Sequence, residues 1–416
     1  MCPQNTPPAD TDLDDTTPSR GRPVVRLKPK VEGRIIRFGF PWVYADELVM
    51  DRRTQNLPLG TIAVLEDGDR REIALVTVNI KSKIICRVLD RDCAAVIDQA
   101  WFVARLRTAL ALRERLYATP HYRLVHAESD GLPGVVIDRF GDTAVIQPNA
   151  AWAEAHLDML VAALVAVTGV AHVVKNGAGR ARGLEGLKEE TVLLCGAVDA
   201  PLDVPMNGAI YRADVMGGQK TGLFYDQRPN HAFAAGLARG ARVLDMFSHV
   251  GGFALAALAG GAVQALAVDA SAAALVLAAE GAAASGVADR FATRQGEAFE
   301  VLEQLGTDGA QFDLVICDPP AFAPNKSALE AGLRAYERLA RLAAPLVAPG
   351  GYLVLCSCSH AADLQAFRNA CSRGIGRGGR SGQLLHTGFA GPDHPMLPQL
   401  AESAYLKSLV FRLDGA

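Results

Sequence analysis

The sequence predicts an α/β protein whose C-terminal half folds as a Rossmann-like, doubly wound domain, preceded by a small β-barrel and a small α+β domain. Three observations support this organisation. From about residue 205, strand-like apolar runs alternate with helical segments, which is typical of a parallel sheet with right-handed crossovers. Residues 24–93 hold short runs rich in β-branched side chains that turn residues interrupt. Between them, residues 96–117 carry apolar side chains at roughly helical spacing.

The length and composition of the chain agree with several full-sized cores. Its 416 residues exceed one ordinary domain, and the contents of 50% hydrophobic and 21% charged residues exclude global disorder. Residues 1–22 are rich in Pro, Thr and Asp, which predicts a disordered tail rather than a secretory signal. We place the barrel at 23–94, the α+β domain at 95–200 and the doubly wound domain at 201–416.

Each domain is assigned from elements with their own sequence signal. In the barrel, a strand at 60–65 ends at Asp67-Gly68, a pair typical of hairpin turns, and further strands follow at 73–78 and 84–89. The central domain is predicted to contain helices at 96–117 and 151–168 and strands at 135–137, 144–147 and 171–174. The C-terminal domain is predicted to contain strands at 243–247, 263–268, 312–317 and 351–357 and helices at 253–258, 271–284 and 329–346.

The charge of the chain is distributed unevenly. Its 42 basic and 45 acidic residues give a net charge of −3, so there is no overall basic signature of a nucleic-acid-binding protein. One acidic residue, Glu32, interrupts a basic segment made of Arg20, Arg22, Arg26, Lys28, Lys30, Arg34 and Arg37. Such a segment either docks phosphates on a near-neutral protein or forms a solvated face, and charge alone does not separate the two interpretations.

Cysteine and histidine usage excludes two kinds of site. The 8 cysteines are scattered without a CxxC pair, which favours a reduced, cytoplasmic compartment over a disulfide framework. The histidines show no metal-ligand spacing, so no metal is expected. Residues 246–268 lack charged side chains, but they include Ser248, His249, Gln264 and paired glycines. They therefore predict a strand, loop and helix rather than a membrane span.

Two groups of residues follow the first strands of the predicted sheet, where ligands bind in such folds. The first is the run Asp245-Met-Phe-Ser-His-Val-Gly-Gly-Phe253, in which Gly251 and Gly252 allow close approach of a ligand to the start of a helix. The second is Asp269, which can accept hydrogen bonds from two ribose hydroxyls. Together they favour a nucleoside cofactor. The glycine spacing differs from GxGxxG, which weakens the alternative of a nicotinamide-dependent dehydrogenase.

The third group is the turn Asp318-Pro-Pro-Ala-Phe322, which follows a buried strand. Its two prolines predict a rigid, extended turn that holds the Asp318 carboxylate against a planar substrate. Phe322 is positioned in the sequence to stack on a base, although a loop containing a core phenylalanine has the same pattern.

These residues resemble the bacterial 23S ribosomal RNA cytosine-C5 methyltransferases of the large-subunit methyltransferase I type, over nearly the whole chain after the tail. The resemblance is carried by Arg26-Leu-Lys-Pro-Lys, Arg37-Phe-Gly-Phe-Pro-Trp-Val-Tyr44, Glu128-Ser-Asp-Gly-Leu-Pro-Gly-Val-Val-Ile-Asp-Arg139, Gly218-Gln-Lys-Thr-Gly-Leu-Phe-Tyr-Asp-Gln-Arg228, the groups at Asp245, Asp269 and Asp318, Asp393-His-Pro395 and Tyr405-Leu-Lys407. It implies a PUA-like RNA-binding barrel, a class I methyltransferase domain, large-subunit ribosomal RNA as partner and a possible homodimer.

The resemblance also implies a set of binding residues, carried over position by position. S-adenosylmethionine (SAM) is expected at Phe224, Gln227, Arg228, Asp245, Phe247, Ser248, Gly251, Gly252, Asp269, Ala270, Glu297, Asp318 and Pro319. RNA is expected at Arg26, Lys28, Lys30, Arg34, Arg37, Phe322 and Lys326. The chain departs from the family at Gly296-Glu297, where an Asp is usual. The run from Arg373 to Arg380 has no clear family counterpart, and its glycines predict a loosened or re-aimed helix.

The resemblance implies covalent catalysis. A thiolate that adds to C6 of cytosine makes C5 nucleophilic enough to take a methyl group, which requires a cysteine near the base and an acid at N3. Ser357-Cys358-Ser359 matches the family pattern at the end of a strand, so Cys358 is the expected nucleophile and Asp318 the group at N3. Cys356 lies upstream on the same strand and is expected to be deeper in the sheet, and Cys317 is expected in the core.

Two other functions remain open from the residues themselves. A D-P-P-x-F turn also accepts hydrogen bonds from an exocyclic amine, so methylation of adenine or guanine without a cysteine is the alternative enzyme. A non-catalytic RNA-binding ribosome assembly factor that retains the fold is the alternative outside enzymes. The presence of Gly251, Gly252, Asp269 and Asp318 counts against the latter.

Overall fold

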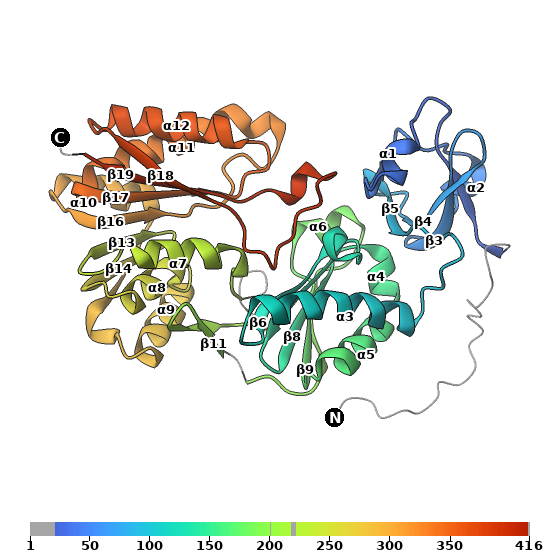
Figure 1. Cartoon of the computed structure of the whole chain (residues 1–416), viewed down its shortest axis with the longest axis horizontal. Coiled ribbons are helices and arrows are strands. Elements are labelled where there is room, and N and C mark those ends of the chain that lie inside the picture. The colour runs from blue at the N-terminus through green and yellow to red at the C-terminus, as the bar shows by residue number, and fades with distance from the viewer. Residues whose placement is uncertain (1–20, 200, 218–221, 415–416) are drawn as a thin grey trace. The chain divides into compact units, whose positions relative to one another are not determined.

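The computed structural model describes residues 21–199, 201–217 and 222–414. Residues 1–20 of the tail predicted at 1–22 and the start of the motif at 218–221 lie outside the described residues. The chain divides into two compact units (Figure 1). The first comprises Met1–Ala200, Val215–Thr221 and Asp393–Ser403, and the second comprises Pro201–Asp214, Gly222–Pro392 and Ala404–Ala416.

The first unit begins with a five-stranded sheet in the order β1-β3-β4-β5-β2. Its elements are β1 (Val24–Arg26), α1 (Arg34–Arg37), β2 (Trp42–Tyr44), α2 (Arg52–Gln55), β3 (Thr61–Glu66), β4 (Glu72–Val78) and β5 (Ile84–Asp90). The hairpin predicted at Asp67-Gly68 joins β3 to β4, which pair antiparallel. Buried side chains of these strands form a small core that includes Val43, Val76 and Ile85.

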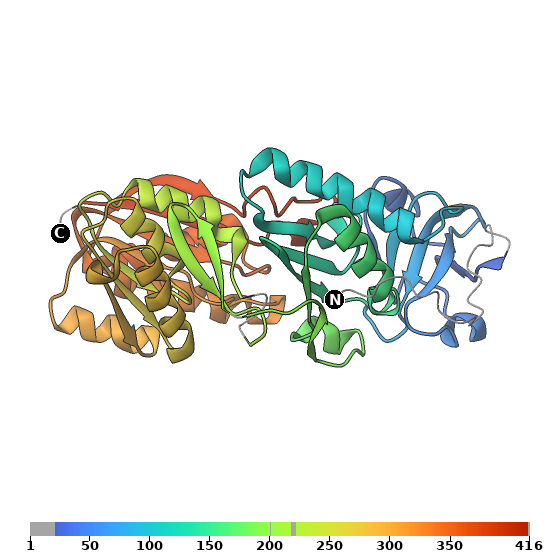
Figure 2. The ribbon, with the colours of Figure 1, turned by 90° about the horizontal axis from the view of Figure 1, so that it is seen from below.

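The central part of the same unit is a second five-stranded sheet in the order β10-β9-β8-β7-β6. Its elements are α3 (Gln99–Leu116), β6 (His121–His126), β7 (Val135–Phe140), β8 (Thr143–Pro148), α4 (Ala151–Ala155), α5 (Leu157–Thr168), β9 (His172–Asn176), α6 (Arg180–Leu184) and β10 (Thr191–Cys195). The N-cap Asp98 accepts a hydrogen bond from the Trp101 amide (2.8 Å), which starts α3. Figure 2 shows α3, in teal, lying along this sheet.

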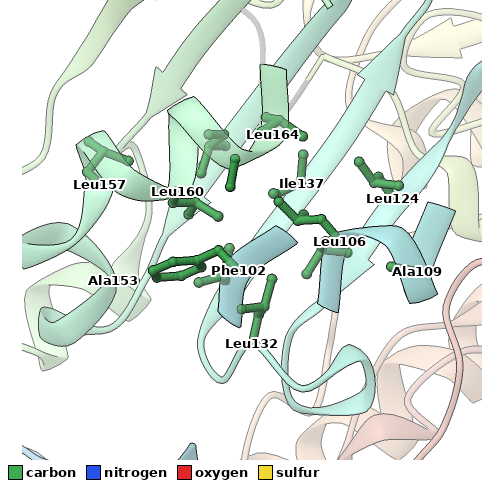
Figure 3. Close-up of a cluster of buried hydrophobic side chains, with 14 of the residues drawn as sticks. Phe102, Leu106, Ala109, Leu124, Leu132, Ile137, Ala153, Leu157, Leu160 and Leu164 are labelled. Carbon is green, nitrogen blue, oxygen red and sulfur yellow. The ribbon is translucent and has the colours of Figure 1, made fainter. Parts of the chain in front are cut away.

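The core of the central sheet is shared with the barrel. Phe102 and Leu106 of α3 meet Leu160 and Leu164 of α5 over the sheet (Figure 3). The same buried cluster also contains the barrel residues Val64, Leu75 and Leu89. The barrel and the central sheet therefore depend on one another for burial of apolar surface.

The second unit contains a seven-stranded sheet in the order β15-β14-β13-β16-β17-β19-β18, in which β19 runs antiparallel to its neighbours β17 and β18. Its strands are β13 (Arg242–Met246), β14 (Gln264–Asp269), β15 (Phe291–Gln295), β16 (Phe312–Cys317), β17 (Val347–Ser357), β18 (Gly382–Gly388) and β19 (Lys407–Leu413). A separate hairpin is made of β11 (Leu202–Met206) and β12 (Ala209–Ala213). The predicted Rossmann-like fold class is confirmed, and the order of strands reverses between β13 and β16.

Helices cover both faces of this sheet (Figure 1). They are α7 (Arg228–Gly236), α8 (Gly252–Ala259), α9 (Ala272–Ala284), α10 (Ala298–Thr307), α11 (Leu329–Ala343) and α12 (Leu364–Arg377). The set α10, α11 and α12 packs over one buried cluster that includes Leu302, Leu339 and Phe367, and α7, α8 and α9 lie on the other side. Within the described part of the chain, no helix is long and apolar enough to cross a membrane.

The prediction for the Arg- and Gly-rich run at 373–380 is wrong. The run completes α12, and its Gly374 packs so tightly on α11 that a Cβ would lie 2.3 Å from the Glu337 carbonyl oxygen. Glu337 forms ion pairs with Arg373 and Arg377. Arg380 is buried and donates to the Asp414 carbonyl (2.9 Å). The glycines allow close helix packing, and the arginines are held by groups more than 30 residues away that local sequence cannot reveal.

Candidate active site

The loop that follows β13 has a constrained backbone. Phe247 and His249 have φ angles of 61° and 50°, in the left-handed region that residues other than glycine rarely adopt. Between them, the buried Ser248 hydroxyl has no hydrogen-bond partner within the described residues. Such strain and an unpartnered polar group at the switch point of the strand order are typical of a ligand site.

Asp269 at the end of β14 holds this loop in place. One of its carboxylate oxygens accepts the His249 amide (2.9 Å), and the other accepts the Ser271 amide (2.8 Å), which begins α9. Each oxygen retains a further lone pair, and the side chain is half-buried. Asp269 can therefore accept two hydroxyl groups, as the sequence predicts for a ribose. The adjacent Ala270 is exposed.

Asp245 plays a different part from Asp269, because it is fully buried inside β13. One carboxylate oxygen accepts the Ala254 amide in the first turn of α8 (2.9 Å), which joins the strand to the helix. Burial, together with the carboxylates of Asp318 and Asp269, raises the pKa of Asp245 to about 8. The side chain is thus a neutral acid in the fold at pH 7 and supports the loop from beneath.

This buried acid predicts a pH dependence of stability. The pKa of Asp245 in the fold lies above that in the unfolded chain, so stability falls as the pH rises from about 4 to about 8. Replacing it as Asp245→Asn removes this dependence. The stability of the variant relative to the wild type should rise with pH, by at most about 1.4 kcal/mol per pH unit. Urea unfolding of both proteins at pH 5, 6.5 and 8 measures the difference, and a constant difference would contradict the assignment.

Gly251 and Gly252 have structural roles besides the predicted close approach of a ligand. Gly251 has a φ of 81° and is the N-cap of α8, a conformation that favours glycine. A Cβ on Gly252 would lie 2.9 Å from the ring of the buried His231. Gly252 is thus required by the contact between α7 and α8, and Gly251 by its backbone conformation, reasons that the sequence did not indicate.

The end of the 218–228 motif lies beside the same loop. The Phe224 ring meets the His249 ring edge to face, with centroids 5.0 Å apart. Gln227 is buried near the Cys356 thiol, whose pKa is raised by burial. Arg228 begins α7 and is half-buried. Two of the predicted cofactor residues, Phe224 and Gln227, therefore lie near the ends of β13 and β17.

Asp318 follows β16, directly beside β13. Its amide donates to the Met246 carbonyl (3.3 Å), its side chain is half-buried, and Pro319 is buried behind it. Phe322 lies against Tyr336, with ring centroids 4.9 Å apart, and is part of an aromatic cluster. Stacking of Phe322 on a base stays a prediction, because much of its ring already packs on the core. Lys326 is exposed.

Glu297 caps the start of α10 at the far edge of the sheet. Its side chain is exposed and makes no capping hydrogen bond to the helix. Glu297 follows the carboxyl end of β15, which pairs in parallel with β14. It therefore lies at the same edge of the sheet as Asp269. Contact of Glu297 with a nucleoside stays a prediction.

The three cysteines near the sheet differ in exposure. Cys317 and Cys356 are fully buried, and burial raises the pKa of both thiols. Cys358 is half-buried at the end of β17. The registers of β16 and β17 pair Cys317 with Leu355, so Asp318 and Cys358 follow neighbouring strand ends. The predicted catalytic pair is therefore brought to one edge of the sheet.

The sequence predictions missed the polar residues that hold Cys358. Tyr336 and the serines on either side of Cys358 form a buried hydrogen-bonded group, and Lys407 approaches from β19. The serines and Lys407 lie in motifs that carry the family resemblance, but the sequence did not indicate a role for them. Tyr336 is 22 residues from the motif and carries no local signal.

The five basic residues of the barrel that are predicted to bind RNA fall into two groups. Arg26 and Arg37 form ion pairs with Glu66 and Asp67, both at 2.8 Å, so their charges are partly neutralised. The remaining three, Lys28, Lys30 and Arg34, are exposed, and Arg34 lies 4.9 Å from the centroid of the exposed Phe38 ring. These three residues carry the outward positive charge of the predicted RNA surface.

The described residues contain no cluster of His, Cys, Asp and Glu suited to a metal ion.

We expect the combined variant Lys28→Ala, Lys30→Ala, Arg34→Ala to bind RNA more weakly at low salt. Each lost phosphate contact should reduce the slope of log affinity against log salt by nearly one, so a decrease of about two to three is expected. SAM affinity should be unchanged. Filter binding across salt concentrations measures this, with Arg52→Ala, Arg53→Ala on α2 as control. Point variants are required, because removing the barrel would expose the core that it shares.

Two sequence profiles match the chain. The profile described as S-adenosylmethionine-dependent methyltransferase matches residues 185–412, and that described as PUA-like domain matches residues 25–91. The ribosomal RNA large subunit methyltransferase of Deinococcus radiodurans is 34% identical over 96% of this chain and 100% of its own length. The ribosomal RNA large subunit methyltransferase I of Photobacterium profundum is 35% identical over 91% of this chain and 96% of its own.

The fold also matches solved structures. A protein assigned as a SAM-dependent methyltransferase from Streptococcus mutans superposes with a TM-score of 0.78 at 19% identity, covering 94% of this chain and all (100%) of that one. A second protein assigned as a methyltransferase, SMU.776, was solved in complex with SAH. It superposes with a TM-score of 0.79 at 20% identity, covering 94% of this chain and 99% of its own. At these identities the similarity establishes the fold.

Proposed function

Because the chain belongs to the family of SAM-dependent methyltransferases that includes the large subunit methyltransferase I proteins, we propose that it methylates C5 of a cytosine in 23S ribosomal RNA. The cofactor is SAM. The observation that carries the choice of C5 is the half-buried Cys358, which follows the strand next to the one that Asp318 follows, while Cys317 and Cys356 are fully buried. Ribosomal RNA as substrate would place the reaction in the cytoplasm.

The residues around the β13 loop fit the cofactor. Asp269 offers two acceptor oxygens for ribose hydroxyls, the Ser248 hydroxyl lacks a partner within the described residues, and Phe224 lies beside the same loop. When bound, SAM supplies an electrophilic methyl group on a sulfonium. The protein's task is to hold that methyl group in line with C5 and to make C5 nucleophilic.

In the proposed mechanism, Cys358 and Asp318 act on the base. The Cys358 thiolate adds to C6, while Asp318 protonates or hydrogen-bonds N3, so that the electron pair of the C5–C6 bond becomes available at C5. C5 then takes the methyl group. Loss of the C5 proton restores the C5–C6 double bond and expels the Cys358 thiolate. Each bond formed to sulfur is thus broken again, and the protein returns to its starting state.

The nucleoside product tests this proposal. The purified protein is incubated with labelled SAM and large-subunit RNA that lacks its modifications, and the digested RNA is analysed for the labelled nucleoside. Label in 5-methylcytidine supports the proposal. Label in a methylated purine would retain SAM but remove the role of Cys358. Absence of SAM binding in a direct titration would instead favour the assembly factor.

A further inference from the structure

Lys407 is a buried cation beside the loop that carries Cys358. It is the first residue of β19 and pairs in register with Ser357 on β17. Its side chain is 4% exposed. The ammonium group donates to the Ser359 carbonyl (2.8 Å) and to the Ala362 carbonyl (2.7 Å). Both acceptors lie just after Cys358, so Lys407 holds the backbone segment that follows Cys358 in the chain.

The other side of the loop is held by Tyr336 of α11. Its hydroxyl accepts a hydrogen bond from the Ser357 hydroxyl (2.9 Å) and bonds to the Ser359 hydroxyl (2.8 Å). The Ser359 oxygen also accepts the Ala323 amide (2.9 Å), in the loop that begins at Asp318. The backbone on both sides of Cys358 is thus fixed, and the loop is joined to the turn that carries Asp318.

The charge of Lys407 is not needed for these hydrogen bonds. No carboxylate among the described residues lies within ion-pair distance of its ammonium group, although burial of an ammonium group without an anion is costly. Burial lowers the pKa of Lys407, and the charges of Cys358 and Asp363 oppose this effect. A buried cation in this position favours an anion nearby, and the Cys358 thiolate is the anion that the proposed reaction requires.

We propose that Lys407 is a positioning residue that fixes the Cys358 loop and stabilises the Cys358 thiolate by its positive charge. This inference rests on the proposed nucleophilic role of Cys358. The thiol loses its proton to water, the electron pair remains on sulfur, and Lys407 stays protonated. The other ionisable groups around the loop are Tyr336 on α11, Cys356 on β17, Asp318 after β16, His360 and Tyr405 in the adjoining loops and Asp363 before α12. The two carboxylates oppose ionisation of the thiol, and Lys407 favours it.

The test is the pH dependence of alkylation of Cys358 by iodoacetamide, measured by mass spectrometry of the peptide without RNA or SAM. Lys407→Gln keeps N–H donors for the two carbonyls but removes the charge. We expect at least ten-fold slower alkylation at pH 7 and an apparent thiol pKa raised by about one unit or more. Lys407→Arg keeps the charge and should stay close to wild type. Arg412→Met removes an exposed cation of the same strand and serves as control.

Two results would overturn the inference. One is a folded Lys407→Gln variant whose alkylation profile equals that of the wild type. The other is a folded Lys407→Arg variant whose alkylation is slowed as much as that of Lys407→Gln, because the charge would then have no effect on the thiol. Failure of the proposed function is distinguishable, because it appears as full methylation activity in Cys358→Ala, whatever the alkylation profile of the thiol.

Discussion

Replacing Cys358 by alanine should abolish methyl transfer, with a loss of at least about 10³-fold in turnover, while SAM affinity stays close to wild type. The physical reason is that C5 of cytosine is a poor nucleophile until sulfur has added to C6. The thiol is half-exposed at the end of β17, so its removal leaves no cavity in the core. Single-turnover methylation and SAM titration measure the two quantities separately.

Cys356→Ala is the matched control for this variant. Cys356 is fully buried two residues upstream, and its thiol donates to the Ser408 hydroxyl (3.4 Å). Its removal should lower stability by about 1 kcal/mol or more and leave turnover nearly intact. Full activity in Cys358→Ala, or complete loss in Cys356→Ala without unfolding, would refute the assignment of the nucleophile.

Replacing Asp318 by asparagine should give the second large effect, a loss of about 10²- to 10⁴-fold in turnover. An amide keeps the shape of the turn but cannot supply a proton to N3. The carboxylate follows β16 on the strand end next to that of Cys358, where it can reach the same base. Because the Cys358 addition should depend on this proton, the variant should also form the covalent adduct slowly.

The adduct can be measured with RNA that carries 5-fluorocytidine at the target, since fluorine at C5 cannot leave as a cation and the protein stays attached. Denaturing electrophoresis then separates attached from free protein. Asp318→Asn should attach much more slowly than the wild type. Adduct formation at the wild-type rate would show that Asp318 does not act on N3. Asp313→Asn, an exposed acid on the same strand, is the control.

The fold could be predicted largely from local patterns. The alternation of apolar strands and amphipathic helices after residue 205 corresponds to β13, β14, β16 and β17 within a few residues, because burial on both faces leaves a continuous apolar run. The antiparallel pair β18 and β19 had no such signal. Leu384 and Leu385 on β18 are exposed and adjacent, so the strand shows no alternation along its length.

The candidate site was predictable to the extent that it depends on chain order. Asp245, Asp269 and Asp318 each follow or end a strand, and parallel strands bring these ends to one edge. The protonation of Asp245 was not predictable, because its pKa depends on desolvation by side chains that come from other elements. The sequence treats Asp245 and Asp269 alike, while the structure buries the first and leaves the second half-exposed.

The sequence by itself determined the class of fold. It also determined which candidate residues follow the strands, among them Cys358 of the Ser-Cys-Ser motif. Only the tertiary structure decided which charges face outward and which residues hold the loop that carries Cys358. Arg26 and Arg37 form ion pairs with acids 40 and 30 residues away, and Lys407 meets Ser359 from a strand 48 residues further on. The physical reason is that periodicity is local, whereas burial and electrostatic pairing arise between segments that only folding brings together.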